Sequence, residues 1–213
     1  VIKVLEAQGI HPEIIVGTSA GAVVGALYAA GNSGFDLQKL ALKMDESKIS
    51  DWSLPDRGVL KGESLQLFVN EAVAHKPIEA LKKPFAVVAT DLGNGESILF
   101  RTGNTGMAVR ASATVPGIFK PVTITGHEYV DGGLSSPVPV RGTRQMGADV
   151  ILDTNFGADV VIMEEGTELL GKLREKKRPT FTSCCPAWIN FAEKHYPEIL
   201  PMLSTTRSPQ AVM

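Results

Sequence analysis

The sequence predicts an α/β protein, in which helices cover a β-sheet, and three observations lead to this class. Short apolar runs typical of buried strands alternate with segments of helical composition along the first two thirds of the chain. Turns that contain glycine or proline separate most of these segments. The composition, with 44% hydrophobic and 21% charged residues over 213 residues, is that of a globular chain long enough to bury a core.

The first third of the chain is predicted to hold one strand among several helices. The strand covers residues 13–16, which are mostly apolar, and a glycine-rich turn follows it at once. The loop over 50–62 contains Pro55, Gly58 and Gly62. Helical composition or helical spacing of apolar residues predicts four helices, at 1–8, 22–31, 36–45 and 64–75.

The next part of the chain is predicted to contain most of the strands. Residues 85–92 form a continuous apolar run, and the segment GNGES turns it into a second strand at 98–100. A helix over 105–113 ends before Pro116, because proline disfavours helix in the residue that precedes it. The remaining predicted elements are a strand over 127–133, a short helix over 141–146 and a strand over 148–152.

Charge and cysteine content narrow the class of protein. A formal net charge of −2 gives no electrostatic basis for binding nucleic acid, and no apolar stretch is long enough to span a bilayer. Cys184 and Cys185 are adjacent and are the only cysteines, so a disulfide framework is not expected and a reducing, cytoplasmic location is favoured. Because the sequence begins at Val1 within helical composition, we expect the true N-terminus, with any targeting signal, to be missing.

Ser19 is the first candidate catalytic residue. It is the middle residue of Gly17-Thr18-Ser19-Ala20-Gly21, between a predicted strand and a predicted helix, which is the setting of a nucleophile elbow. Glycines are expected on both sides because flanking side chains would clash in so tight a turn. The hydroxyl would then lie at a helix N-terminus, where backbone N–H groups favour a developing oxyanion. A simple N-cap serine is the alternative interpretation of the same residues.

A serine nucleophile needs a group that accepts its proton. Asp131 is a candidate, because it begins an Asp-Gly-Gly turn at a strand end and can reach the end of a neighbouring strand. An ordinary turn aspartate is the alternative. None of the histidines has a convincing setting; they are His11, His75, His127 and His195.

Together these residues resemble the patatin-like phospholipase family. The resemblance covers residues 1–151 through ordered motifs: GTSAGA, ATDL with GES, AVRASATVPGIFKPV, YVDGGLSSPVPV and GTRQMGADVI. It implies a three-layer α/β/α fold and a Ser–Asp dyad that hydrolyses acyl esters of lipids. Ser19 would be the nucleophile and Asp131 its base, with no histidine. The motif glycines would be Gly17, Gly21, Gly132 and Gly133.

One feature of the family is not found in this sequence. The family has a glycine-rich oxyanion loop with a basic residue, placed after the first strand and before the helix that leads to the elbow. No segment before Val1 supplies it here, so we expect a sheet that is incomplete at its N-terminus. Loss of a single oxyanion donor costs on the order of 10²–10³ in rate, so an inactive chain is one expected outcome.

The last sixty or so residues resemble a different family, the catalytic domain of iron-only hydrogenases. The motifs are DTNFGADVVIMEEGTELL, TFTSCCPAWINFAEKHYPEIL and LSTTRSPQ. The resemblance implies that Cys185 would be the cubane ligand, and that the proton relay would consist of Cys184, Glu165, Glu168 and Ser204. An iron–sulfur cubane needs about four thiolates and the chain has two cysteines, so no metal or cofactor is expected.

The four letters Gly-Ala-Asp-Val occur at 147–150 and again at 157–160, and we interpret this doubling as a seam between the two families. The predicted domains are therefore 1–151, patatin-like, and 152–213, a mostly helical hydrogenase-like fragment. We expect lipid or acyl ester as substrate, with a peripheral membrane contact left open. Three alternatives also stay open: a hydrogenase fragment, a catalytically silent chimera, and a Ser–Asp–His hydrolase that uses Ser19, Asp91 or Asp131, and His195.

Overall fold

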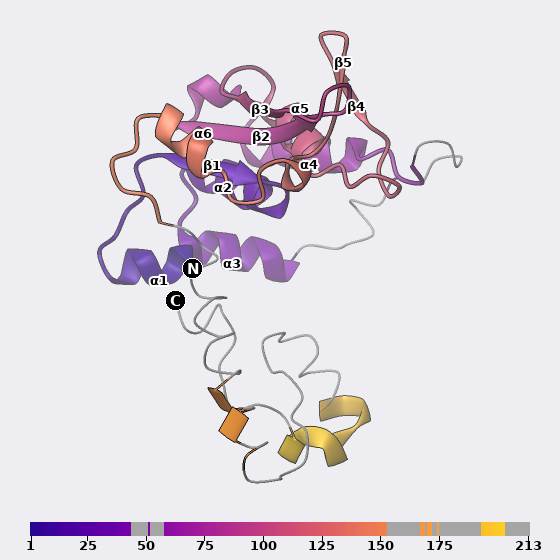
Figure 1. Cartoon of the computed structure of the whole chain (residues 1–213). Helices are drawn as coiled ribbons and strands as arrows, with labels where there is room; N and C mark the ends of the chain where they lie inside the picture. The colour runs from indigo at the N-terminus through magenta and orange to yellow at the C-terminus, as the bar shows by residue number, and fades with distance from the viewer. Residues whose placement is uncertain are drawn as a thin grey trace. The chain divides into compact units, whose positions relative to one another are not determined.

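The computed structural model describes residues 1–43, 51, 58–152, 167–168, 170–171, 174 and 193–202. The chain divides into two compact units, Ile2–Ile151 and a second unit that consists of Val1 with Leu152–Met213. Figure 1 shows the elements of both. Helices and a mixed sheet make up the described part of Ile2–Ile151, which confirms the predicted α/β class.

The sheet of Ile2–Ile151 has five strands: β1 (Ile15–Thr18), β2 (Phe85–Asp91), β3 (Ser97–Phe100), β4 (Val122–Ile124) and β5 (His127–Asp131). The α-helices described in the same unit are α1 (Ile2–Ala7), α2 (Ala20–Ala29), α3 (Gly34–Lys43), α4 (Glu63–Ala72), α5 (Thr105–Ser112) and α6 (Val140–Gln145). Short 3₁₀ turns occur at η2 (Ile78–Ala80) and η3 (Gly132–Leu134). In the second unit, η4 covers Pro197–Met202.

Strand β2 is the centre of the sheet, and its pairing fixes where the other strands end. β1 runs parallel to it, with Thr18 opposite Val88, and β5 runs antiparallel, with Asp131 opposite Ala89. β3 pairs with both Val88 and Ala89. A strand can pair with a neighbour on each of its two sides, and β3 occupies one side of β2. Strands β1 and β5 therefore both pair with the other side of β2, one after the other along its length. The last residues of β1 and β5 therefore meet, although they are far apart in sequence.

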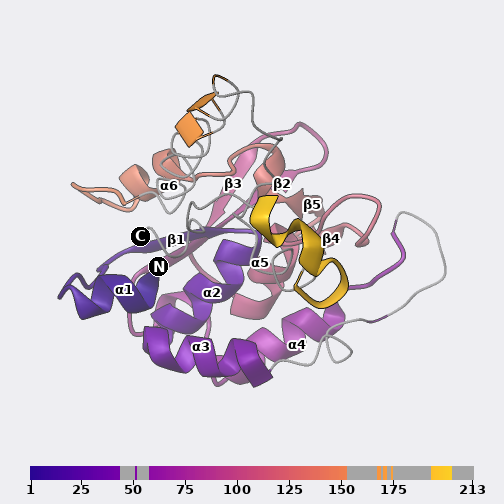
Figure 2. The same cartoon turned by 90° about the horizontal axis from the view of Figure 1, so that it is seen from below.

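Helices cover both faces of the sheet. A Cβ at Gly25 of α2 would come within 3.0 Å of the Ile15 side chain, so α2 lies against the face to which Ile15 points. A Cβ at Gly142 of α6 would come within 3.7 Å of Val16, whose side chain points to the opposite face. Helix α2 also contacts α3, α4 and α5, which places it centrally in its layer (Figure 2). Sheet and helices thus form the three layers of an α/β/α fold.

The main core lies between β2 and the layer that contains α2. All seven residues of β2 are buried, as expected for a strand covered on both faces. Alternate β2 residues point into this core, where they meet small side chains of α2 and branched side chains of α4 and α5. The buried residues of this main core are Ala22, Ala26, Ala29, Val69, Val73, Ile78, Phe85, Val87, Ala108 and Val109.

Strand β4 is not among the strands that the sequence pattern predicts. It forms a hairpin with β5, in which Val122 lies opposite Tyr129 and Ile124 lies opposite His127. The two turn residues, Thr125 and Gly126, have φ of 49° and 85°. Positive φ at both central residues is the geometry of a two-residue hairpin turn, so this pair closes the hairpin.

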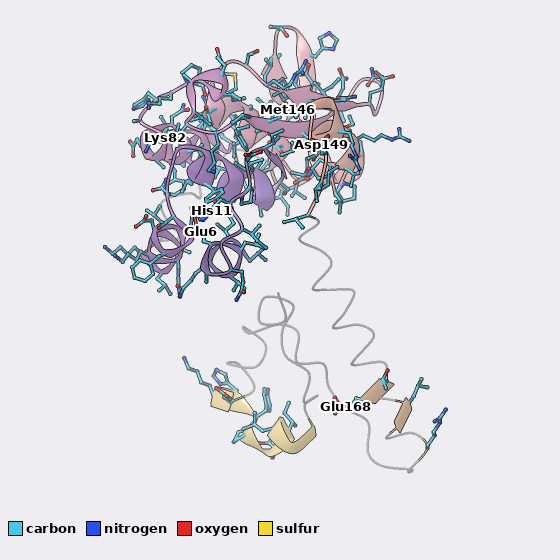
Figure 3. The ribbon with its side chains drawn as sticks, turned by 90° about the vertical axis from the view of Figure 1, so that its left-hand side faces the viewer. Glu6, His11, Lys82, Met146, Asp149 and Glu168 are labelled. Carbon is cyan, nitrogen blue, oxygen red and sulfur yellow. The ribbon has the colours of Figure 1, made fainter. Side chains whose placement is uncertain are left out.

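The strand predicted over 148–152 is wrong. Residues 148–152 form no strand in the structure, and Val150 is 79% exposed. The backbone carbonyls of Ala148 and Asp149 accept hydrogen bonds from the guanidinium of Arg144 in α6, at 3.1 and 2.8 Å. The backbone that follows α6 is therefore bound by the Arg144 side chain and joins no strand; Met146 and Asp149 of this segment are labelled in Figure 3.

Candidate active site

Ser19 lies between β1 and α2, in a backbone conformation that few residues other than glycine adopt. Its φ is 53° and its ψ is −124°. A non-glycine residue held there costs about 1–3 kcal/mol, and such strain is common at functional sites. The residue is followed at once by the first turn of α2, and its carbonyl accepts the hydrogen bond from Ala22 at 2.9 Å. The structure therefore places Ser19 at a turn between a strand and a helix.

The steric argument for glycine holds at one side of Ser19 only. A Cβ at Gly17 would lie 2.5 Å from the Cα of Ala22, so a side chain at residue 17 cannot be accommodated. A Cβ at Gly21 would have no heavy atom within 4 Å. The expectation that both flanking glycines avoid a clash is therefore wrong for Gly21. The chain returns over Gly17 as it enters α2, whereas Gly21 already lies on the open side of the helix.

Asp131 ends β5 and is 7% exposed. Its Oδ1 accepts a hydrogen bond from the backbone N–H of Gly133 at 2.7 Å. Its Oδ2 accepts the hydroxyl hydrogen of Ser19 at 2.6 Å. The structure therefore brings together the two residues that the sequence singled out, although they are 112 positions apart.

The glycines after Asp131 allow this approach. A Cβ at Gly132 would lie 2.2 Å from the backbone oxygen of Val88 in β2, so the backbone passes too close to the sheet for any other residue. A Cβ at Gly133 would lie 3.0 Å from Oδ1 of Asp131, the oxygen that its own N–H binds. The Asp-Gly-Gly sequence thus fits the carboxylate against the end of β1.

Three further residues, none of them a candidate from the sequence alone, hold the backbones of Ser19 and Asp131. The N–H of Asp131 donates to the carbonyl of Thr114 at 2.8 Å, and its carbonyl accepts from the Thr90 hydroxyl at 2.9 Å. The N–H of Ser19 donates to the Ser112 hydroxyl at 2.8 Å. Ser112 and Thr114 belong to the motif AVRASATVPG and Thr90 to ATDL, so the motifs themselves carried the only signal for these residues.

His127 pairs with Asp91 and not with the Ser19–Asp131 pair. His127 lies in β5, where its Nδ1 is 2.9 Å from Oδ2 of Asp91. The other oxygen of Asp91 accepts from the N–H of Gly93 at 2.8 Å. Burial, followed by the charge of Asp91, raises the pKa of Tyr129 above its ordinary value of 10.0, so this phenol stays protonated. Asp91 therefore belongs to a separate polar cluster three residues along β2 from Val88.

The model of the patatin-like phospholipase family matches residues 1–144, which include β1, β2, β5 and both members of the Ser19–Asp131 pair. The chain belongs to the patatin-like phospholipase family. An uncharacterised protein of the NTE family from Mycobacterium tuberculosis is 33% identical over 154 residues, which are 71% of this chain and 43% of that protein. Patatin-like phospholipase domain-containing protein 6 from Mus musculus is 29% identical over 166 residues, 74% of this chain and 12% of that protein.

The end of this patatin-like chain is similar to a second family. The model of the C-terminal domain of the iron-only hydrogenase large subunit matches residues 137–213, so the two family models overlap at 137–144. Iron hydrogenase 1 from Clostridium pasteurianum is 53% identical over 70 residues, 32% of this chain and 12% of that protein. A solved structure of apo FeFe-hydrogenase from Chlamydomonas reinhardtii is 51% identical and covers 33% of this chain and 18% of that chain, with a TM-score of 0.28.

The two family models and the curated relatives confirm that the chain joins a patatin-like segment to a hydrogenase-like one. The chain spans less than half the length of each of these curated relatives. Of the residues that the hydrogenase resemblance singled out, Glu168 is described, in a helical segment of the second unit (Figure 3). The others lie outside the described residues: Glu165, Cys184, Cys185 and Ser204.

Metal-binding groups and membrane-spanning helices are the remaining features of interest. Within the described part of the chain, no group of three or more histidine, cysteine, aspartate or glutamate side chains is arranged to hold a metal ion. None of the helices described is both long enough and apolar enough to cross a bilayer.

Proposed function

We propose that this chain is a serine-dependent hydrolase of lipid acyl esters, with Ser19 as nucleophile and Asp131 as its base. The observation that carries the proposal is the hydrogen bond of 2.6 Å from the Ser19 hydroxyl to Oδ2 of Asp131. It joins a hydroxyl on a strained strand-to-helix turn directly to a carboxylate. Family membership supports the same chemistry, since the matching model is that of patatin-like phospholipases.

In the first step, Oγ of Ser19 attacks the carbonyl carbon of the ester while Oδ2 of Asp131 accepts the hydroxyl proton. The resulting tetrahedral oxyanion collapses, the bond to the alcohol oxygen breaks, and Asp131 returns the proton to the leaving alcohol. In the second step, Asp131 takes a proton from water and the resulting hydroxide attacks the carbonyl carbon of the acyl-enzyme. The bond from that carbon to Oγ of Ser19 breaks, and Asp131 returns the proton to Oγ. The products are one carboxylic acid and one alcohol.

The carboxylate is prepared for this role by its other hydrogen bond. Oδ1 of Asp131 is occupied by the N–H of Gly133 at 2.7 Å, so Oδ2 is left to the Ser19 hydroxyl. The two backbone bonds of Asp131, to Thr114 and from Thr90, restrict rotation of the residue as a whole. A base held in this way loses little entropy when it takes the proton.

The oxyanion would form beside the start of α2. The N–H groups of the first turn of a helix have no acceptor within the helix, and the helix dipole places partial positive charge there. Helix α2 begins at Ala20, directly after the nucleophile. Among the residues described, we therefore assign the backbone N–H of Ala20 as the hydrogen-bond donor to the oxyanion.

A lipid substrate is supported by apolar side chains next to the groups that hold Asp131. Val115 follows Thr114 and is 39% exposed, and Leu134 follows Gly133 and is 63% exposed. Ile118, in the same loop as Val115, is 48% exposed. We propose that these side chains contact the acyl chain of the lipid or the surface of the membrane that contains it. We also propose that the chain acts in the cytoplasm.

The test is ester turnover by the full chain and by Ser19→Ala, with a para-nitrophenyl acyl ester as substrate. We expect the wild type to release para-nitrophenol and Ser19→Ala to release none above the rate in buffer. Ser33→Ala is a matched control, because Ser33 also precedes a helix but forms its side-chain bond with Asp36. Turnover by Ser19→Ala at the wild-type rate would remove Ser19 from the mechanism.

The hydrogenase-like segment supports a second candidate, iron–sulfur redox chemistry, through its match over residues 137–213. The residues present do not fit a cubane, because a cubane takes about four thiolates and the sequence has two cysteines. We therefore propose that this chain binds no cluster and is not a redox enzyme. Iron and sulfide analysis after anaerobic reconstitution tests this: stoichiometric iron would restore the redox candidate.

A further inference from the structure

Ser112 occupies an unusual place between the nucleophile and the sheet. It is the last residue of α5 and is 0% exposed. Its hydroxyl donates a hydrogen bond of 2.5 Å to the carbonyl of Val88 in β2. The same oxygen accepts the backbone N–H of Ser19 at 2.8 Å. One buried hydroxyl thus connects the nucleophile's backbone to the central strand.

The chemistry of the two partners fixes the direction of both bonds. A backbone carbonyl can only accept, so the Ser112 hydrogen points to Val88. A backbone N–H can only donate, so the lone pairs of the Ser112 oxygen face Ser19. The Ser112 hydroxyl therefore acts once as a donor, to Val88, and once as an acceptor, from Ser19. An alanine at residue 112 would leave both the N–H of Ser19 and the carbonyl of Val88 without this partner.

The three backbone segments that form the site meet at the same residue of β2. Val88 lies opposite Thr18 in the sheet, so it determines where β1 ends and Ser19 begins. The carbonyl of Val88 also faces Gly132, where a Cβ would come within 2.2 Å of it. Ser112 binds this carbonyl and reaches Ser19 from the side of α5. The position of the Ser19 backbone relative to Asp131 is thereby set through Val88.

We propose, on the basis of the hydrolase function proposed above, that Ser112 is a positioning residue for the nucleophile. Its hydroxyl holds the N–H of Ser19 so that the residue keeps φ of 53° and its Oγ stays aimed at Asp131. A second consequence concerns the oxyanion. Because the N–H of Ser19 is bound to Ser112, it is not free to stabilise the oxyanion, and that task falls to the N–H of Ala20.

The first test compares Ser112→Ala with Thr105→Val in the full chain. Thr105 is at the other end of α5, is 0% exposed and donates to the carbonyl of Lys76 at 2.7 Å, so the control also removes one buried hydroxyl bond. We expect Ser112→Ala to lower kcat about 10- to 100-fold, the range that a slightly misplaced reacting group costs, with little change in KM. Thr105→Val is expected to leave kcat near the wild-type value. An equal loss in the two variants would overturn the proposal.

The second test is amide hydrogen exchange, measured by NMR residue by residue, and it does not depend on activity. In Ser112→Ala we expect the Ser19 amide to exchange at least about tenfold faster, the equivalent of one hydrogen bond. The Asp131 amide, which donates to Thr114, is expected to keep its protection and shows that the sheet is intact. Ser112→Cys, of similar volume but with a weaker hydrogen-bonding group, serves if the alanine variant does not fold.

The outcomes separate this inference from the hydrolase proposal. Unchanged exchange at Ser19 in the Ser112 variants would overturn the positioning role even if the wild type hydrolyses esters. If the wild type shows no turnover at all, the hydrolase proposal fails, and the exchange rate of the Ser19 amide alone decides whether Ser112 holds the nucleophile's backbone.

Discussion

At the scale of single residues, the site depends on a few short contacts between backbone and side chain. The carboxylate of Asp131 binds the Ser19 hydroxyl through one oxygen and the Gly133 N–H through the other. The glycines next to the pair are needed to different degrees. A Cβ would lie 2.5 Å from a backbone atom at Gly17 and 2.2 Å from one at Gly132, whereas a Cβ at Gly21 would face open space. Substitutions at these positions should therefore differ in effect.

Asp131→Asn is expected to lower kcat by about 10²–10⁴, the usual contribution of a general base, because an amide cannot take the Ser19 proton. The fold should persist, since the asparagine oxygen can still accept the Gly133 N–H. Steady-state ester kinetics and near-UV circular dichroism measure the two effects. Wild-type turnover by Asp131→Asn would assign the base to another residue.

Gly132→Ala is expected to abolish ester turnover or prevent folding, because its Cβ would overlap the carbonyl oxygen of Val88. Gly21→Ala is the matched control, and we expect it to leave turnover unchanged, since no heavy atom lies within 4 Å of its Cβ. Expression yield, thermal unfolding and ester kinetics of the pair provide the comparison. Equal damage in both variants would contradict the steric account of the turn.

At the scale of elements, strand pairing and helix caps determine where functional residues lie. Strands β1 and β5 end at adjacent residues of β2, Val88 and Ala89, which brings Ser19 and Asp131 into contact. Helix α3 shows how local sequence fixes an element. The backbone N–H of Asp36 donates to the Ser33 hydroxyl at 3.2 Å, and the Asp36 carboxylate accepts the backbone N–H of Ser33 at 3.1 Å, which is a reciprocal cap. The Ser33 hydroxyl in turn donates to the Asp36 carboxylate at 2.6 Å.

The cap of α3 gives a prediction with a pH dependence. The hydroxyl and the backbone N–H of Ser33 hold the pKa of Asp36 below its ordinary value of 3.8. The pKa of Asp36 is lower in the folded chain than in the unfolded chain, so the ionised carboxylate stabilises the fold at pH values above 3.8. This stabilisation is lost as the pH falls through the pKa of Asp36 in the folded chain. Ser33→Ala should cost about 1 kcal/mol at pH 7, a typical loss for an N-cap.

Urea unfolding of wild type and Ser33→Ala at pH 7 and near pH 3 measures this difference in free energy of unfolding. We expect the deficit of Ser33→Ala to shrink at the lower pH, because Asp36 is then partly protonated in the wild type as well. A deficit that grows on acidification would show that the pKa of Asp36 is raised rather than lowered.

Sequence patterns predicted the elements whose signal is local. The buried run of β2, the strand-to-helix turn at Ser19 and the Asp-Gly-Gly turn could all be predicted from a few adjacent residues. Strand β4 was missed, although Thr125-Gly126 is a two-residue turn whose positive φ values suit a hairpin. The strand expected over 148–152 was wrong because Arg144 binds the carbonyls of Ala148 and Asp149, a competition that an apolar pattern does not reveal.

The role of Ser112 could not be predicted from its neighbours in sequence. Its two partners, Ser19 and Val88, are 93 and 24 positions away, and only the packing of α5 on β2 brings them together. The same holds for Thr114, whose carbonyl binds the N–H of Asp131. A buried hydroxyl in a helix has many local partners available, so its long-range contact has to be seen in the structure.

At the scale of the whole molecule, the site and the hydrogenase-like segment belong to different units. Ser19, Asp131, Ser112 and Val88 all lie in Ile2–Ile151. Cys184 and Cys185 belong to the unit of Leu152–Met213, in the part that the hydrogenase model matches. The proposed chemistry uses no residue of that second unit.

Replacing both cysteines, as in Cys184→Ser with Cys185→Ser, is therefore expected to leave kcat for the ester unchanged. The reason is that the proposed mechanism needs a hydroxyl and a carboxylate, and neither thiol contributes to it. Ester kinetics of the double variant and of wild type, under reducing conditions, supply the measurement. Loss of turnover on removal of the thiols would show that the second unit takes part in catalysis.

The most direct measurement is the site at which a fluorophosphonate probe attaches to the full chain, found by proteolysis and mass spectrometry. Because Asp131 binds the Ser19 hydroxyl, we expect one adduct, on Ser19, and a strongly reduced yield of that adduct in Asp131→Asn. An adduct on another serine, or labelling of Ser19 that is as fast without the Asp131 carboxylate as with it, would contradict a Ser19–Asp131 dyad.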